Sequence, residues 1–84
     1  MSGSLSGTGA SDIYTYTLFT GTHNFILHGP SNADFDLYLY RNNPLKASST
    51  SSTSEEEIHY VGSANKVRVY SYSGSGSYTL CYLL

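Results

Sequence analysis

The stretch DFDLYLY, residues 34–40, decides the fold of this chain because its aliphatic and polar side chains alternate. Successive side chains of an extended strand point to opposite faces, so the two leucines share one face and the two tyrosines, with Asp36, share the other. This alternation is typical of a strand with one face against a core and the other toward solvent. Asp34 and Asp36 stand at the junction where the preceding loop enters the strand.

The C-terminal segment repeats this pattern as a predicted hairpin. In residues 66–72, Val67 and Val69 alternate with an arginine and two tyrosines, and the valines mark the core side. The Ser- and Gly-rich residues 73–77 tolerate the positive φ angles of tight turns and predict the connection. The returning strand, residues 77–84, is expected to point three side chains inward: Tyr78, Leu80 and Tyr82.

Elsewhere, short bursts of β-branched and aromatic residues are separated by Gly, Pro, Asn and Ser clusters about every ten residues, and no stretch shows helical periodicity. The sequence therefore predicts an all-β fold, a jelly-roll-like antiparallel β-sandwich of about seven to eight short strands. Further strands are expected at 12–20, 24–29 and 58–61, with a short edge strand or a loop at 46–54.

Composition and charge exclude several classes of function for this chain. The chain has 84 residues, enough for one domain, and 12% of them are charged, against about 25% in typical globular proteins. A formal net charge of −2 gives no basic surface for nucleic acid or an anionic membrane. The apolar runs are too short for a membrane span. We expect a soluble monomer that binds no nucleic acid.

Two features concern the ends of the chain. Residues 1–11 are rich in Ser and Gly and have neither a basic start nor an apolar run, so no signal peptide is indicated. They are expected to be a flexible linker or an expression remnant, and residues 12–84 the domain. Cys81 is the only cysteine, which excludes an internal disulfide, and its phase in the last strand predicts a small half-buried residue.

Catalytic motifs are missing. The chain has no Gly-x-Ser-x-Gly elbow, no His-Glu-x-x-His frame and no phosphate-binding loop. The three histidines are expected at the surface or at a sheet edge, and the acidic run at 55–57 as a solvated loop before a strand. We therefore expect that this chain is not an enzyme.

The order of these signals resembles the bacterial pre-peptidase C-terminal (PPC) domain, a β-sandwich attached to secreted metallo- and serine peptidases. Nearly all of the chain after residue 11 is covered. The matching segments are Tyr16-Thr17-Leu18, Phe25-Ile26-Leu27, ADFDLYLY at 33–40, Glu57-Ile58-His59-Tyr60 and VRVYSYSGSGSYTL at 67–80. The resemblance implies a secreted, extracellular protein of a bacterium or archaeon, with a peptidase catalytic domain covalently linked to this one.

The collagen-binding domains of clostridial collagenases are similar to that sandwich, and they bind calcium and fibrous substrate through a tyrosine-lined face. Tyrosine has a large, stiff apolar body with a polar tip, which suits an extended polymer. The expected substrate-binding residues here are Tyr38, Tyr40, Arg68, Tyr70 and Tyr72. The alternative is that these rings only cover the sheet edges and a second core layer of a thin sandwich.

The resemblance also implies a calcium site. Carboxylate oxygens at a loop-to-strand junction suit Ca²⁺, which takes six to eight oxygen ligands. The expected ligands are Asp34 and Asp36, with Asp12 completing the set if the N-terminal segment folds back. The alternative is that Asp36 caps backbone amides of the adjoining loop and that no cofactor is required.

Together these observations predict a non-catalytic accessory domain of a secreted peptidase, binding a collagen-like protein polymer or a surface. Two alternatives stay open. One is a structural or secretion-assisting domain that is removed after export. The other is a carbohydrate-binding module, which the absence of Trp disfavours because Trp is the ring best suited to stacking on sugars.

Overall fold

The computed structural model describes residues 1–83, which form one antiparallel sheet of six strands in the order β1-β6-β2-β5-β3-β4. The all-β antiparallel prediction is confirmed, with six strands in place of the seven or eight expected. The strands are β1 (Ser2–Leu5), β2 (Ser11–His28), β3 (Asp34–Tyr40), β4 (Leu45–Ser49), β5 (Glu55–Ser73) and β6 (Gly76–Leu83).

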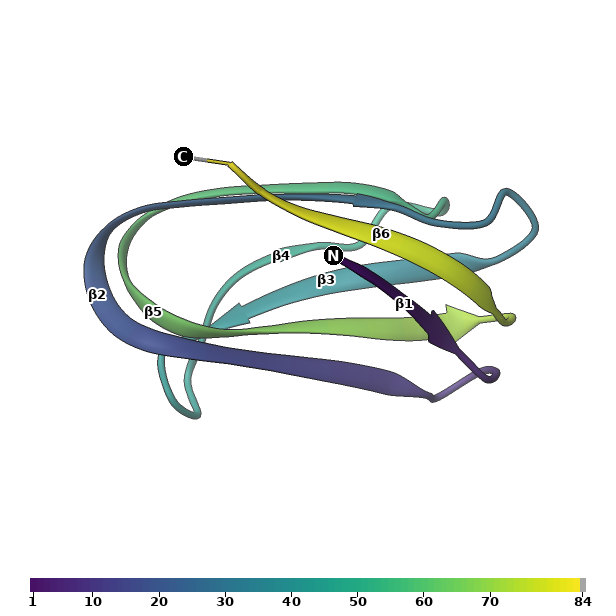
Figure 1. Cartoon of the computed structure of the whole chain (residues 1–84), viewed down its shortest axis with the longest axis horizontal. Helices are drawn as coiled ribbons and strands as arrows, with labels where there is room; N and C mark the ends of the chain where they lie inside the picture. Colours follow the sequence, from purple (N-terminus) through teal and green to yellow (C-terminus); the bar gives the residue numbers. More distant parts are fainter. Residues whose placement is uncertain (84) are drawn as a thin grey trace.

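Two long strands give the sheet its sandwich shape. β2 and β5 pair along nearly their whole length, with one shift of register between Thr15 and Phe19. Both strands curve round at one end of the molecule, so that the sheet doubles over and its two halves face each other (Figure 1). Gly21 and Gly62 are partners in this pairing, and glycine allows a bend without a side-chain clash.

This curvature corrects the predicted strand boundaries. Residues 12–20 and 24–29, expected as two strands, lie on the single strand β2, apart from Gly29. Residues 58–61 and 66–72 lie likewise on β5. The predicted strand ends at Gly21 and Gly62 are wrong, because these glycines let the chain bend while the backbone hydrogen bonds continue.

The core lies between the two halves of the folded sheet. The alternation seen in the sequence is confirmed, because Leu37, Leu39, Val67 and Val69 are each at most 1% exposed. The opposite half contributes further side chains that are at most 4% exposed: Phe25, Leu27, Ile58 and Leu80. The aliphatic side of each predicted strand therefore faces the interior.

Residues 1–11 are part of the fold and not a linker. β1 pairs with β6, and Leu5 is 3% exposed within the core. Backbone bonds also join Gly9 and Ala10 to Ser71. The prediction missed this because a four-residue Ser-Gly segment has little β propensity of its own, and the free edge of β6 provides the pairing.

The C-terminal hairpin agrees in most respects with its prediction. Gly74, in its turn, has φ of 86°, and an added Cβ would lie 2.8 Å from the Cβ of Ala33, so the turn requires glycine. Tyr78 and Leu80 are buried as expected, whereas Tyr82 is partly exposed and packs on the ring of Phe25. Cys81 is half-buried.

The described residues include no helix long and apolar enough to cross a membrane.

Candidate functional site

The outer face of strands β3 and β5 carries the predicted tyrosines. Tyr38 is the register partner of Arg68, and Tyr40 is the partner of Lys66. Since the leucines and valines of these strands are buried, the tyrosines and basic residues between them lie on the opposite, outward side. All five predicted contact residues therefore share one surface, the tyrosine face: Tyr38, Tyr40, Arg68, Tyr70 and Tyr72.

Ring contacts hold this face in place. The rings of Tyr38 and Tyr70 meet edge to face with centroids 6.3 Å apart. The guanidinium of Arg68 lies 4.9 Å from the centre of the Tyr70 ring, and the ammonium of Lys66 lies 5.0 Å from that of Tyr40. These cation–π contacts restrict rings that are only partly buried.

Tyr72 and Arg68 differ in how open they are to a partner on this face. Tyr72 is 66% exposed, so its ring can be covered by a partner without rearrangement. The Nε of Arg68 is buried and, in the described part of the chain, has no hydrogen-bond partner. Burial, and next the carboxylate of Asp36, raise the pKa of Tyr38, which keeps its hydroxyl protonated as a donor.

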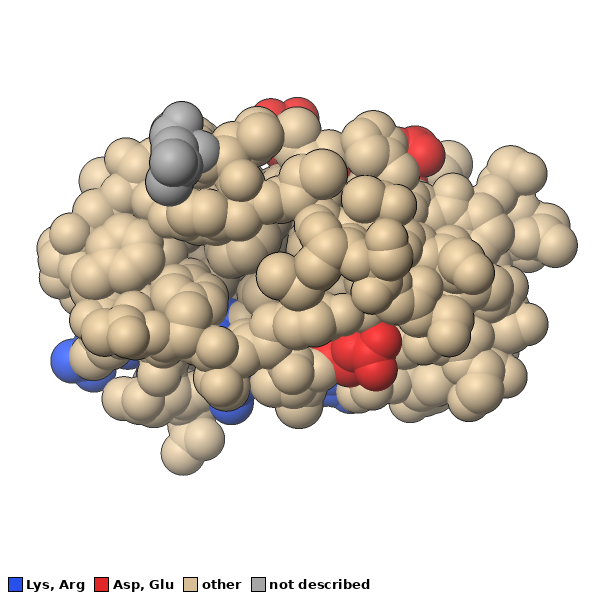
Figure 2. Space-filling model, viewed as in Figure 1, with Lys and Arg blue, Asp and Glu red and all other residues tan. Residues whose placement is uncertain are grey.

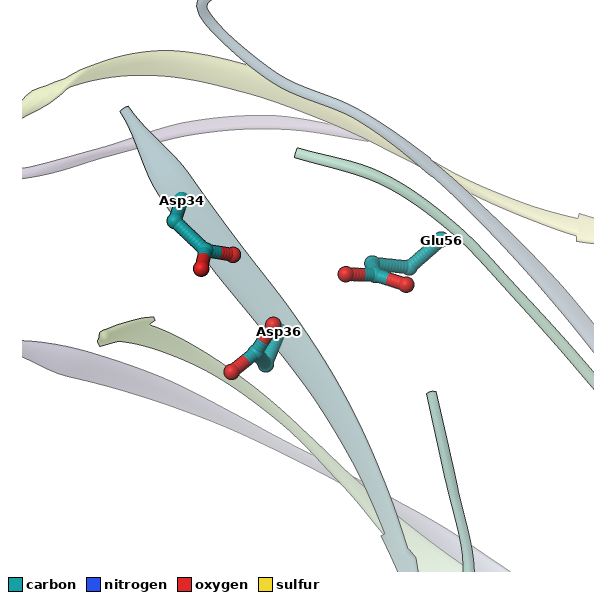
Figure 3. A group of neighbouring side chains, drawn as sticks. All are labelled: Asp34, Asp36 and Glu56. Atoms are coloured by element: carbon teal, nitrogen blue, oxygen red, sulfur yellow. The ribbon is translucent and has the colours of Figure 1, made fainter. Parts of the chain in front are cut away.

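An acidic cluster lies next to the tyrosine face. Asp34 and Asp36 project from the start of β3, and Glu56 reaches toward them from the start of β5 (Figure 3). One carboxylate oxygen of each residue lies within 4.8 Å of the other two. Asp36 and Glu56 are each 3% exposed.

The three carboxylates differ in their hydrogen bonding. Glu56 accepts bonds from the Ser49 hydroxyl at 2.7 Å and from the amide and hydroxyl of Ser51 at 3.2 and 3.0 Å. The Oδ1 atoms of Asp34 and Asp36 are buried without a partner among the described residues. The reading in which Asp36 caps loop amides therefore has no support, because the loop after β4 bonds to Glu56 instead.

The cluster is electrostatically unfavourable when it is fully ionised. Burial, followed by repulsion from Asp34 and by hydrogen bonding to Glu56, raises the pKa of Asp36 to about 7. Two buried carboxylates beside a half-buried one can be neutralised by protons or by a cation. Closely spaced carboxylate and hydroxyl oxygens are the ligands that Ca²⁺ takes. The residues present therefore fit a hard divalent cation.

The cluster and the tyrosine face meet in one open pocket of about 380 Å³. Its wall includes two of the carboxylates and two of the tyrosines, together with the loop after β4: Asp34, Asp36, Tyr38, Thr50, Ser51, Ser52 and Tyr72. A cation bound to the carboxylates would thus lie beside the surface proposed to bind the polymer.

One predicted ligand, Asp12, is not part of the cluster. Its Oδ2 accepts a bond from the Tyr78 hydroxyl at 2.6 Å. Glu56 is the third carboxylate instead, and it lies on a strand, not in the solvated loop expected for 55–57. The sequence did contain a signal, because Glu56 is in phase with Ile58 and Tyr60, which places it on the inner face of an alternating strand.

The histidines divide in a way that the sequence did not predict. His23 is fully buried and bonded to the Tyr16 hydroxyl at 2.8 Å, which excludes the surface position. The alternative expectation of a sheet edge stays open, because the pairing of β2 with β6 begins only at Asn24. His28 is exposed, as expected, and pairs with Glu55 at 2.5 Å.

No protein-family model matches the chain.

Proposed function

We propose that this chain is a non-catalytic accessory domain, of the pre-peptidase C-terminal kind, that binds a collagen-like protein polymer for a secreted peptidase linked to it. The observation that carries the proposal is the tyrosine face itself. Tyr38, Tyr40, Arg68, Tyr70 and Tyr72 lie side by side on two paired strands. Tethering a catalytic domain to a polymer raises its local concentration without any chemistry in this chain.

The chemistry of the face suits an extended polypeptide. Phenol rings provide broad apolar contact, and because rings already held by neighbours lose little freedom on binding, the entropic cost is small. The hydroxyls of the tyrosines can bond backbone carbonyl groups of a polymer. One such patch is small, so we expect weak binding by a single domain.

Calcium belongs to the proposal as a structural ligand of the acidic cluster. It would be held by Asp34, Asp36 and Glu56, and would fix the loop after β4, which borders the tyrosine face. A ligand bound only by the native state stabilises it by mass action. The single cysteine excludes an internal disulfide, so a bound cation would add a cross-link from the start of β3 to the start of β5.

The calcium proposal predicts that one substitution, Asp36→Asn, stabilises the calcium-free protein but removes its response to calcium. Asp36→Asn removes a repelling charge, so it should raise the melting temperature in EGTA at pH 8 and abolish the further rise that millimolar Ca²⁺ gives the wild type. Glu57→Gln, an exposed neighbour on the same strand, is the control and should keep the calcium response. A wild-type melting curve unchanged by calcium would remove the metal from the proposal.

Binding of the polymer is tested by co-sedimentation with insoluble collagen. Truncation of an interface tyrosine typically weakens binding about five- to thirtyfold, so Tyr70→Ala and Tyr72→Ala should each lower retention by such a factor. Val61→Ala alters another exposed apolar residue, 68% exposed and outside this face, and should retain wild-type binding. Equal retention of all four proteins would contradict the proposal and favour a structural or secretion-assisting role.

A further inference from the structure

A second cavity, separate from the tyrosine face, opens beside the bend of β2 and β5. Its volume is about 500 Å³, within the range of small-molecule sites. It is lined by Met1, Ile13, Tyr14, Thr15, Tyr16, Phe19, Phe25, Val67 and Tyr82. None of the expected functional residues is among them.

The strand pairing explains why this cavity is not filled. β6 pairs with β2 only from Asn24 to His28, and β1 pairs with β6 over four residues. In the pairing of the described residues, β2 between Ile13 and Thr20 has a partner only on its β5 side. The space between the two halves of the sheet therefore opens along this edge.

The lining favours an aromatic guest without charge. Aromatic rings run along the wall in tilted contact, with Tyr16 to Phe25 at 6.2 Å and Phe25 to Tyr82 at 5.1 Å between centroids. The lining side chains carry no formal charge at neutral pH, and the ammonium of Met1 already donates to the Leu80 carbonyl. A charged guest would lose its water without gaining a partner. On the face of the molecule drawn in Figure 2, Lys, Arg, Asp and Glu form only small, separate patches.

The three wall tyrosines have all used their hydroxyl protons, and Tyr82 donates its own to the carbonyl of Thr22 at 3.4 Å. The Nε2 of buried His23 lies 3.2 and 3.1 Å from the carbonyls of Phe19 and Gly62, so it carries the proton. In the neutral ring Nδ1 is then an acceptor, and the Tyr16 hydroxyl donates to it.

The hydroxyl of Tyr14 is committed in the same way. Tyr78 donates its proton to the carboxylate of Asp12, so the hydroxyl of Tyr14 donates to the oxygen of Tyr78. Each wall phenol thus keeps a lone pair for a guest but no proton.

We infer that this cavity binds a small uncharged aromatic molecule bearing an N–H or O–H donor, of the size and chemistry of an indole or a phenol. The rings of Phe19, Phe25 and Tyr82 contact its faces, and a phenol oxygen of Tyr14 or Tyr16 accepts its donated hydrogen. This site is independent of polymer binding by the tyrosine face.

Indole and 1-methylindole are the probes that test the inference. The chain contains no Trp, so indole fluorescence reports binding directly. Indole should bind saturably, with a dissociation constant on the order of 0.1–1 mM for so small a ligand. One neutral hydrogen bond should make indole about three- to tenfold tighter than 1-methylindole. Tyr14→Phe or Tyr16→Phe should remove this preference.

Matched valine substitutions locate the site. Val67→Phe projects into the cavity and should abolish binding; should that variant not fold, Val67→Leu should weaken binding several-fold. Val69→Leu makes the same change on the same face of β5, outside the cavity lining, and should leave affinity unchanged.

Three results would overturn the inference: no saturable binding, equal affinity for the two probes, or amide NMR shifts from indole that fall on the tyrosine face. Concentration-dependent dimerisation with NMR shifts at the cavity would also overturn it, in favour of a second copy as the occupant.

Discussion

Asp36 is almost completely removed from water, yet one of its carboxylate oxygens has no hydrogen-bond partner among the described residues. Native proteins pair nearly all such atoms, so an orphan of this kind requires an explanation. A bound cation provides one and a proton provides another. The two explanations predict different responses to pH and to calcium.

Without calcium, stability should decrease as the pH rises. The pKa of Asp36 is raised to about 7 in the folded state, above its unfolded value of 3.8, so the folded protein binds the proton more tightly. The stabilisation from this proton is complete below pH 3.8 and is lost as the pH rises through 7. Thermal unfolding in EGTA should therefore give a higher melting temperature at pH 5 than at pH 8. Asp36→Asn should flatten this difference, and a wild-type melting temperature that rises over the same interval would contradict the assignment.

Ser54 provides a second test at the scale of one residue. It is 3% exposed, donates to the carbonyl of Ala33 at 2.8 Å and accepts from the amide of Phe35 at 2.9 Å. Ser54→Ala leaves both buried backbone groups unpaired and should lower the free energy of unfolding by about 1–3 kcal/mol. Chemical denaturation measures the loss. Exposed Ser48→Ala is the control, and an equal effect of the two substitutions would show that the Ser54 bridge is not stabilising.

At the scale of elements, the sequence predicted the sheet face on which each side chain lies better than it predicted where each strand begins and ends. Alternation is a local property of an extended chain, so the inward leucines and valines of β3 and β5 followed directly from it. A glycine such as Gly21 or Gly62 is compatible with the end of a strand or with a bend within it. Only the long-range pairing between β2 and β5 shows that the strand bends and continues. This is why four predicted strands proved to be two.

The candidate site was partly predictable for the same reason. The tyrosines and Asp34 lie on segments whose alternation fixes their side of the sheet. Glu56 comes from a distant strand, and its approach to Asp36 depends on the folding over of the whole sheet. Asp12 was expected nearby, but its hydrogen bond with Tyr78 is a long-range contact that no local pattern indicates.

The edge strand β1 should contribute measurable stability. Leu5 is 3% exposed, and Leu→Ala at buried sites costs about 2–5 kcal/mol. A loss at the low end should lower the melting temperature by roughly 8–16 °C in a domain of this size. Leu45→Ala makes the same change at a residue that is 51% exposed and should have little effect. If Leu5→Ala has the same melting temperature as the wild type, β1 does not contribute to the core in solution.

At the scale of the whole molecule, the folded sheet separates two surfaces of different chemistry. The outer face of β3 and β5 carries tyrosines and basic groups, with the acidic cluster beside it, whereas the edge of β2 opens into an uncharged aromatic cavity. A chain of 84 residues without a disulfide buries a limited core, so its stability should be modest. Ligands at either site should stabilise it further.

The most direct test of the central claim is an amide NMR titration of the calcium-loaded protein with a soluble collagen-like triple-helical peptide. If the tyrosine face binds a protein polymer, chemical-shift changes should concentrate on β3 and on the 66–72 segment of β5, with little change around Val61. Tyr72→Ala should weaken the titration at the same positions. Shift changes spread over other strands, or no change at peptide concentrations in the millimolar range, would contradict the claim that the tyrosine face binds a protein polymer.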